Sequence, residues 1–125
     1  MPRLKQLYLH IEDEESAHEL RSCVILLLER GLEILNMEDF DLQTDDFLKR
    51  ISEVKDCKLE DLVLNNSTSN LSNPLSIHGL LHLVSLPHLK SFFTPCTKFL
   101  MVRYNAVCLF NDMRKNLGYG LVEIR

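Results

Sequence analysis

The chain has 125 residues, the size of one ordinary domain, and its 46% hydrophobic and 26% charged residues form a normal globular mix. The net charge of −4 and the scattered Lys and Arg residues argue against a surface that holds a nucleic-acid backbone. The longest apolar run, CVILLL, has six residues and is too short to span a membrane.

Two pairs of a strand and a helix are predicted in the first half of the chain. Residues 4–9 (LKQLYL) and 32–37 (LEILNM) carry apolar side chains at the first, fourth and sixth positions, which favours short strands. Residues 14–31 and 44–57 show helical spacing, and Gly31 stands where the first helix should end. The apolar residues expected to face inward are Ala17, Leu20, Val24 and Leu28 in the first helix and Phe47, Leu48, Ile51 and Val54 in the second.

The second half repeats the arrangement. Strands are predicted at 59–64 (LEDLVL) and, more weakly, at 89–94 (LKSFFT), and a truncated strand begins at 121–124 (LVEI). Helices are predicted within 73–88, with Asn73 as N-cap and Pro74 at the first helical position, and within 105–120. The apolar positions of these two helices are Ile77, Leu80, Leu81 and Val84, then Val107, Phe110, Met113 and Leu117.

The strands start near residues 4, 32, 59, 89 and 121, which gives periods of 28, 27, 30 and 32 residues. The L-x-x-L-x-L pattern at this spacing resembles the leucine-rich repeat, in its intracellular ribonuclease-inhibitor-like and cysteine-containing, F-box-associated classes. The resemblance implies an α/β fold: a right-handed solenoid of about four repeats, with a short parallel sheet on the concave face and helices on the convex face. Residues 1–125 are expected to form a single such domain and, because neither end shows a capping repeat, to be part of a longer arc.

Alternation along the strands predicts which side chains face outward. These are Gln6, Tyr8, His10, Ile34, Asn36, Glu38, Asp61, Val63, Asn65, Ser91, Phe93 and Pro95. Apolar and aromatic residues recur among them, and exposed clusters of that kind often mark a protein contact. The candidate partner-binding residues of the concave face are therefore Tyr8, Ile34, Asn36, Asp61, Val63 and Phe93. The alternative is that a loop or a flanking domain covers them, or that the register differs by one residue.

The sequence offers little that could support catalysis or metal binding. His78 and His82 lie four residues apart on a predicted helix, but a zinc site would need further ligands and the H-E-x-x-H motif lacks its Glu. The cysteines at 23, 57, 96 and 108 form no C-x-x-C pair and are interpreted as buried thiols in a reducing compartment. Because no signal peptide is recognised, the cytosol or the nucleus is the expected location. No catalytic site, metal or cofactor is predicted.

The function expected from these observations is a non-catalytic protein–protein interaction module that uses the concave sheet. The resemblance implies two settings, which are substrate recognition in a ubiquitin ligase of the F-box kind and a regulatory or sensing array. The alternative is a structural spacer that packs against neighbouring domains or subunits. Another protein or a neighbouring domain is the expected partner, self-association through the uncapped ends is a further expectation, and neither nucleic acid nor a membrane is expected.

Overall fold

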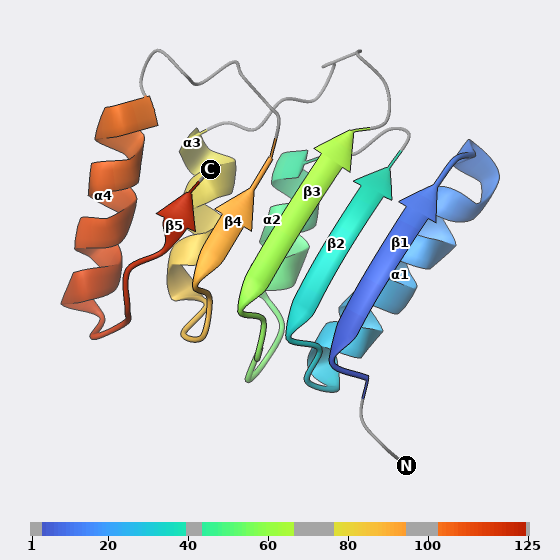
Figure 1. Ribbon diagram of the computed structural model, residues 1–125, viewed down its shortest axis with the longest axis horizontal. Coiled ribbons are helices and arrows are strands. Elements are labelled where there is room, and N and C mark those ends of the chain that lie inside the picture. Colours follow the sequence, from blue (N-terminus) through green and yellow to red (C-terminus); the bar gives the residue numbers. More distant parts are fainter. Residues whose placement is uncertain (1–3, 40–43, 67–76, 95–102, 125) are drawn as a thin grey trace.

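The computed structural model describes residues 4–39, 44–66, 77–94 and 103–124 (Figure 1). Its elements in chain order are β1 (Gln6–Ile11), α1 (Glu14–Glu29), β2 (Ile34–Asp39), α2 (Thr44–Ser52), β3 (Asp61–Asn66), α3 (Ile77–His82), the 3₁₀ turn η1 (Leu83–Ser85), β4 (Ser91–Phe93), α4 (Arg103–Asn116) and β5 (Glu123–Ile124). The predicted cap residues Asn73 and Pro74 and the outward position Pro95 lie outside the described residues.

The strands form one parallel sheet in the order β1-β2-β3-β4-β5, so each strand pairs with the next one in the sequence. The helices lie together behind one face of this sheet, and the opposite face is turned toward the viewer (Figure 1). The α/β class and the parallel sheet expected from the sequence are therefore confirmed at this level. Parallel strands require a crossover between them, and α1 and α2 each provide one.

The pairing register aligns equivalent positions of the sequence pattern. Leu35 of β2 pairs with Leu7 on one side and with Leu62 on the other, and Leu62 pairs in turn with Phe92 of β4. The predicted alternation and register are thus confirmed for these four strands. The observed strands begin two residues after Leu4, Leu32, Leu59 and Leu89, because the first leucine of each pattern precedes the strand.

The core lies between the sheet and the helices. Leu35, Met37, Leu62 and Leu64 are fully buried, as expected for alternate residues of strands that carry helices on one side. Burying each leucine is worth roughly 1.5–3 kcal/mol relative to leaving it in water. The equivalent residues of the edge strand β1, Leu7 and Leu9, are only partly buried.

Both ends of α1 are determined by local sequence. The Asp13 carboxylate accepts hydrogen bonds from the Ser16 backbone N–H at 2.9 Å and from the Ser16 hydroxyl at 2.7 Å, so Asp13 is the N-cap. At the other end Gly31 has a φ of 99°, and the Leu32 N–H donates to the Leu27 carbonyl at 3.1 Å. This six-residue closure, which requires a left-handed residue, confirms the predicted helix end at Gly31.

The two helices after α1 end earlier than predicted. α2 ends at Ser52, although Val54 beyond it is still buried, and α3 (Ile77–His82) ends where the backbone tightens into η1. Leu83 and Leu86, which follow the helix, are buried in the core. Apolar spacing therefore identified residues that face the core, but it could not distinguish a helix from an irregular segment that buries the same side chains.

The helix α4 does not present the predicted face to the core. Met113 and Leu117 are 38% and 55% exposed, whereas Ala106, Phe110 and Arg114 are buried. The three buried residues lie four apart, so they share one helix face. The prediction for Met113 and Leu117 is wrong because Arg114, a cation, takes the core-facing position that an apolar side chain was expected to fill.

The prediction of buried cysteines is wrong for two of the residues that the structure describes. Cys57 is buried, and burial raises the pKa of its thiol, but Cys23 and Cys108 are exposed. In α1 the core-facing positions are taken by Ala17, Val24 and Leu28, which turns Cys23 away. Cys96 lies outside the described residues. Among the described helices, none is both long enough and apolar enough to traverse a bilayer.

Candidate functional site

The six predicted site residues all lie on the sheet face opposite the helices. Tyr8 pairs with Asn36, Asn36 with Val63, and Val63 with Phe93, so these four side chains form a row across four strands. Ile34 and Asp61 pair with each other one step earlier along the strands. The structure therefore brings all six together on one surface, as alternation predicted.

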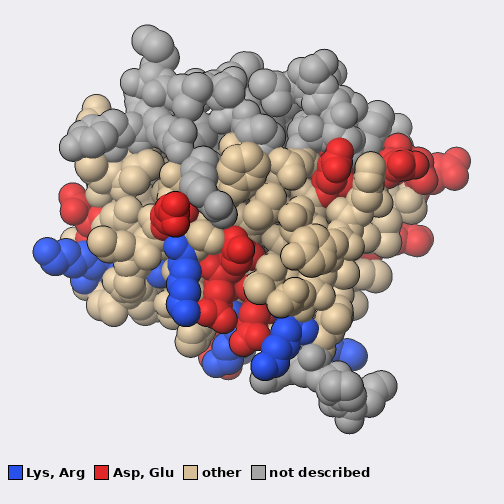
Figure 2. All heavy atoms as spheres, in the orientation of Figure 1, with Lys and Arg blue, Asp and Glu red and all other residues tan. Residues whose placement is uncertain are grey.

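We call this surface the open face and define it by the outward positions of the five strands. They are Gln6, Tyr8, His10, Ile34, Asn36, Glu38, Asp61, Val63, Asn65, Ser91, Phe93 and Glu123. Tyr8 is 70% exposed, and Val63 and Phe93 are half-buried by their neighbours in the sheet. Figure 2 looks onto this face and shows an uncharged area beside acidic side chains near the N-terminal ends of the central strands, with lysine or arginine side chains among them.

Polar side-chain contacts join β3 and β4 where these two strands begin on the open face. The Ser91 hydroxyl donates a short hydrogen bond to the Asp61 carboxylate on the neighbouring strand. Just before these residues, the Lys90 ammonium lies 2.8 Å from the Glu60 carboxylate. That hydrogen bond and the charge of Lys90 lower the pKa of Glu60, and Glu60 raises the pKa of Lys90 by the same contact. Asp61 thus accepts from a neutral hydroxyl at the surface, while Lys90 is paired with Glu60.

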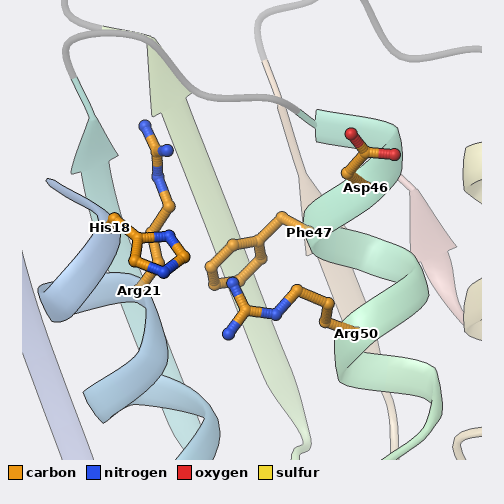
Figure 3. Close-up of a pocket in the computed structure, with 5 residues that line it drawn as sticks. All are labelled: His18, Arg21, Asp46, Phe47 and Arg50. Carbon is orange, nitrogen blue, oxygen red and sulfur yellow. The ribbon is translucent and has the colours of Figure 1, made fainter.

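A hollow lies on the helical side of the molecule, between α1 and α2. Its volume is about 230 Å³, and it is lined by His18, Arg21, Asp46, Phe47 and Arg50. Figure 3 shows His18, Phe47 and Arg50 turned toward the space between the two helices, while the Arg21 guanidinium extends away from that of Arg50 and the Asp46 carboxylate points away from the hollow. Two arginines in the lining would suggest an anion site if their guanidinium groups had no partners within the protein.

The arginines of the hollow are already engaged within the protein. Arg21 makes a bidentate pair with Asp39, with Nε 2.6 Å from Oδ2 and Nη2 2.9 Å from Oδ1, and Asp39 is fully buried. Arg50 donates to the Ser22 hydroxyl at 3.2 Å. The pair ties α1 to the end of β2, and the carboxylate of Asp39 neutralises Arg21. The hollow is therefore a structural junction and a weaker candidate than the open face.

Sequence reasoning missed both buried polar groups. Asp39 and Arg114 are the buried charged residues in the part of the chain that the structure describes. Asp39 follows the alternation of β2 as an inward position, after Leu35 and Met37, so its location could have been read from the pattern. Nothing in the local sequence identifies Arg21, which is 18 residues away, as its partner.

The two histidines that the sequence singled out do not belong to a metal-binding cluster among the described residues. His78 is exposed and His82 is partly buried, and no group of three or more His, Cys, Asp or Glu side chains in residues 4–39, 44–66, 77–94 and 103–124 could hold a metal ion. The open face presents a phenol, amides, carboxylates and apolar groups. Such a surface can form apolar contacts and hydrogen bonds.

Comparisons of the sequence with protein-family models, with curated proteins and with solved structures found no match.

Proposed function

We propose that the chain is a leucine-rich-repeat module that captures a partner protein on the open face of its sheet. Two features support the repeat assignment: strand pattern residues recur every 27 to 32 positions, and consecutive strands pair in parallel with matching pattern positions. Because strands are spaced about 4.8 Å apart and helices about 8–10 Å apart, stacking such units curves the sheet inward. The open face would then be the concave side.

The observation that carries the docking proposal is the row of Tyr8, Val63 and Phe93 on a face that no described helix covers. Two aromatic rings and a branched aliphatic group on a solvent-facing sheet are more apolar surface than the fold itself requires. Aromatic side chains are also the residues most often found at the energetic centre of protein interfaces. Substrate recognition in a ubiquitin ligase and a regulatory array are the settings that we propose for this contact.

The proposal is tested by capturing proteins from cell extract with the tagged chain and with a Tyr8→Ala, Phe93→Ala variant. We expect the variant to lose the specifically captured proteins, because each truncation removes an aromatic contact worth about 1–2 kcal/mol at an interface. The matched control is a Leu26→Ala, Leu109→Ala variant, since both leucines are exposed on helices, at 56% and 48%. The control should capture the same proteins as the unmodified chain, and circular dichroism should show that both variants are folded.

A second function, packing of the module against a neighbouring domain or subunit, is favoured by the apolar residues around β5. Leu117 and Leu121 are 55% and 70% exposed there. If Leu117→Ser with Leu121→Ser abolished capture while the Tyr8 and Phe93 variant retained it, this spacer role would replace the open-face proposal.

A further inference from the structure

The charges of the open face all have one sign. Its twelve outward positions include three carboxylates, Glu38, Asp61 and Glu123, and no lysine or arginine. The face carries one histidine, His10, whose ring lies 3.7 Å from the Glu12 carboxylate. Two lysines, Lys5 and Lys90, stand at the strand entries, and Lys90 is held by Glu60. A partner therefore meets an apolar surface flanked by carboxylates, with the two lysines at one end of it.

The carboxylates stand on both sides of the apolar row. Asp61 precedes Val63 by two residues and Glu38 follows Asn36 by two, which places them roughly 7 Å to either side of the row. The row from Tyr8 to Phe93 crosses three strand spacings, or about 14 Å. An extended segment of about five residues would cover the row while its longer side chains reached carboxylates on either side.

The cations that would balance these carboxylates are not supplied by the described part of the chain. Asp61 accepts from the neutral Ser91 hydroxyl, and no lysine or arginine among residues 4–39, 44–66, 77–94 and 103–124 forms an ion pair with Glu38, Asp61 or Glu123. These carboxylates lie at the surface, within reach of a partner's side chains. They become a source of affinity when a cation is brought to them.

We infer that the open face binds an extended, arginine- or lysine-bearing segment of a partner protein, an inference that rests on the docking function proposed above. The aliphatic stems of such side chains pack on Tyr8 and Val63, and their charged ends meet Glu38 and Asp61. A guanidinium also stacks favourably on an exposed phenol ring such as that of Tyr8. An acidic or phosphorylated segment would meet like charges, and so would a second copy of this same face.

The test uses a fluorescent peptide of about eight residues in which arginine alternates with valine, long enough to cover the row. Two matched probes replace arginine by neutral citrulline or by glutamate. We expect the arginine peptide to bind, the citrulline peptide to bind more weakly and the glutamate peptide to bind weakest, as measured by fluorescence anisotropy. Affinity for the arginine peptide should fall as salt is raised, because the charges are exposed.

Two paired variants distinguish binding of the arginine peptide to the open face from its general attraction to an acidic protein. Glu38→Gln with Asp61→Asn removes two open-face carboxylates, and Glu29→Gln with Asp112→Asn removes two exposed carboxylates from the helices. The first variant should bind the arginine peptide about fivefold to tenfold more weakly, and the second should change affinity less than twofold. Equal weakening by both variants, or equal binding of the three peptides, or no binding of the arginine peptide, would overturn the inference.

The same variants distinguish failure of this inference from failure of the docking function. If captured proteins are lost with the Tyr8 and Phe93 variant but bind the Glu38 and Asp61 variant fully, docking on the open face stands and the cationic partner is rejected. If neither variant affects capture, the docking function itself is rejected.

Discussion

At the residue scale, Arg114 is a buried side chain that depends on hydrogen bonds to backbone carbonyls far away in the sequence. It is fully buried, and its guanidinium donates to the carbonyls of Leu83, Val84, Leu86, Leu89 and Gly120, at distances from 2.6 to 3.4 Å. These carbonyls belong to η1, to the turn before β4 and to the turn before β5. Burial lowers the pKa of Arg114, but an arginine remains charged well above neutral pH. The cation thus holds three irregular segments together.

We therefore predict that Arg114→Lys lowers the free energy of unfolding by roughly 2–4 kcal/mol, because a single ammonium cannot reach five carbonyls and leaves several unpaired. The matched control is Lys115→Arg, an exposed neighbour on the same helix, which should change the free energy by less than about 0.5 kcal/mol. Urea denaturation of both variants measures the difference. Similar stability for the two variants would show that the carbonyl contacts contribute little.

At the scale of elements, the N-cap of α1 makes this helix sensitive to acid. The hydrogen bonds from the Ser16 hydroxyl and backbone N–H lower the pKa of Asp13 below its usual value of 3.8. A carboxyl whose pKa is lowered by folding stabilises the folded state above its unfolded pKa. That contribution is lost as the pH falls through the folded pKa.

We predict that an NMR titration of the Asp13 side chain gives a pKa below 3.8 and that Asp13→Ala lowers the melting temperature at neutral pH. Asp13→Asn keeps a capping oxygen without a titrating group, so it should retain most of the stability at neutral pH and be less sensitive to acid. A normal pKa, or equal melting temperatures for the alanine variant and the unmodified chain, would contradict the capping role in solution.

At the scale of the whole molecule, the strands differ in the number of strands that flank them and in the burial of their inward side chains. β2 and β3 are flanked by strands on both sides, and Leu35, Met37, Leu62 and Leu64 are fully buried. β1 is flanked on one side only, and Leu7 and Leu9 are partly buried. In a stack where each unit contacts its neighbours in sequence, opening should begin at the ends.

Native-state hydrogen exchange tests this expectation. We predict that the hydrogen-bonded amides of β2 and β3 exchange at least about tenfold more slowly than those of β1, because central strands open only when an end has already opened. Uniform protection of the three strands would instead indicate that the sheet opens as a single cooperative unit.

The strand pattern, the pairing of equivalent positions and the open face could be read from the sequence. Tyr8, Asn36, Val63 and Phe93 align because they hold the same position of the repeated pattern, and a shift of one residue would turn Leu35, Leu62 and Phe92 to the other face. The end of α1 was equally local, since Gly31 alone supplies the left-handed residue that the closure needs. These features depend on neighbours in the sequence or on a repeated pattern, and both can be read from the sequence.

Which polar groups are buried and which helix faces meet the core became apparent only in the folded structure. Arg21 finds Asp39 across 18 positions, and Arg114 finds the carbonyl of Leu83 across 31. Because Arg114 could be buried once those carbonyls satisfied it, Met113 and Leu117 turned outward against their apolar character. Burying a charge depends on hydrogen-bonding partners far away in the chain, and such partners exist only after the chain has folded.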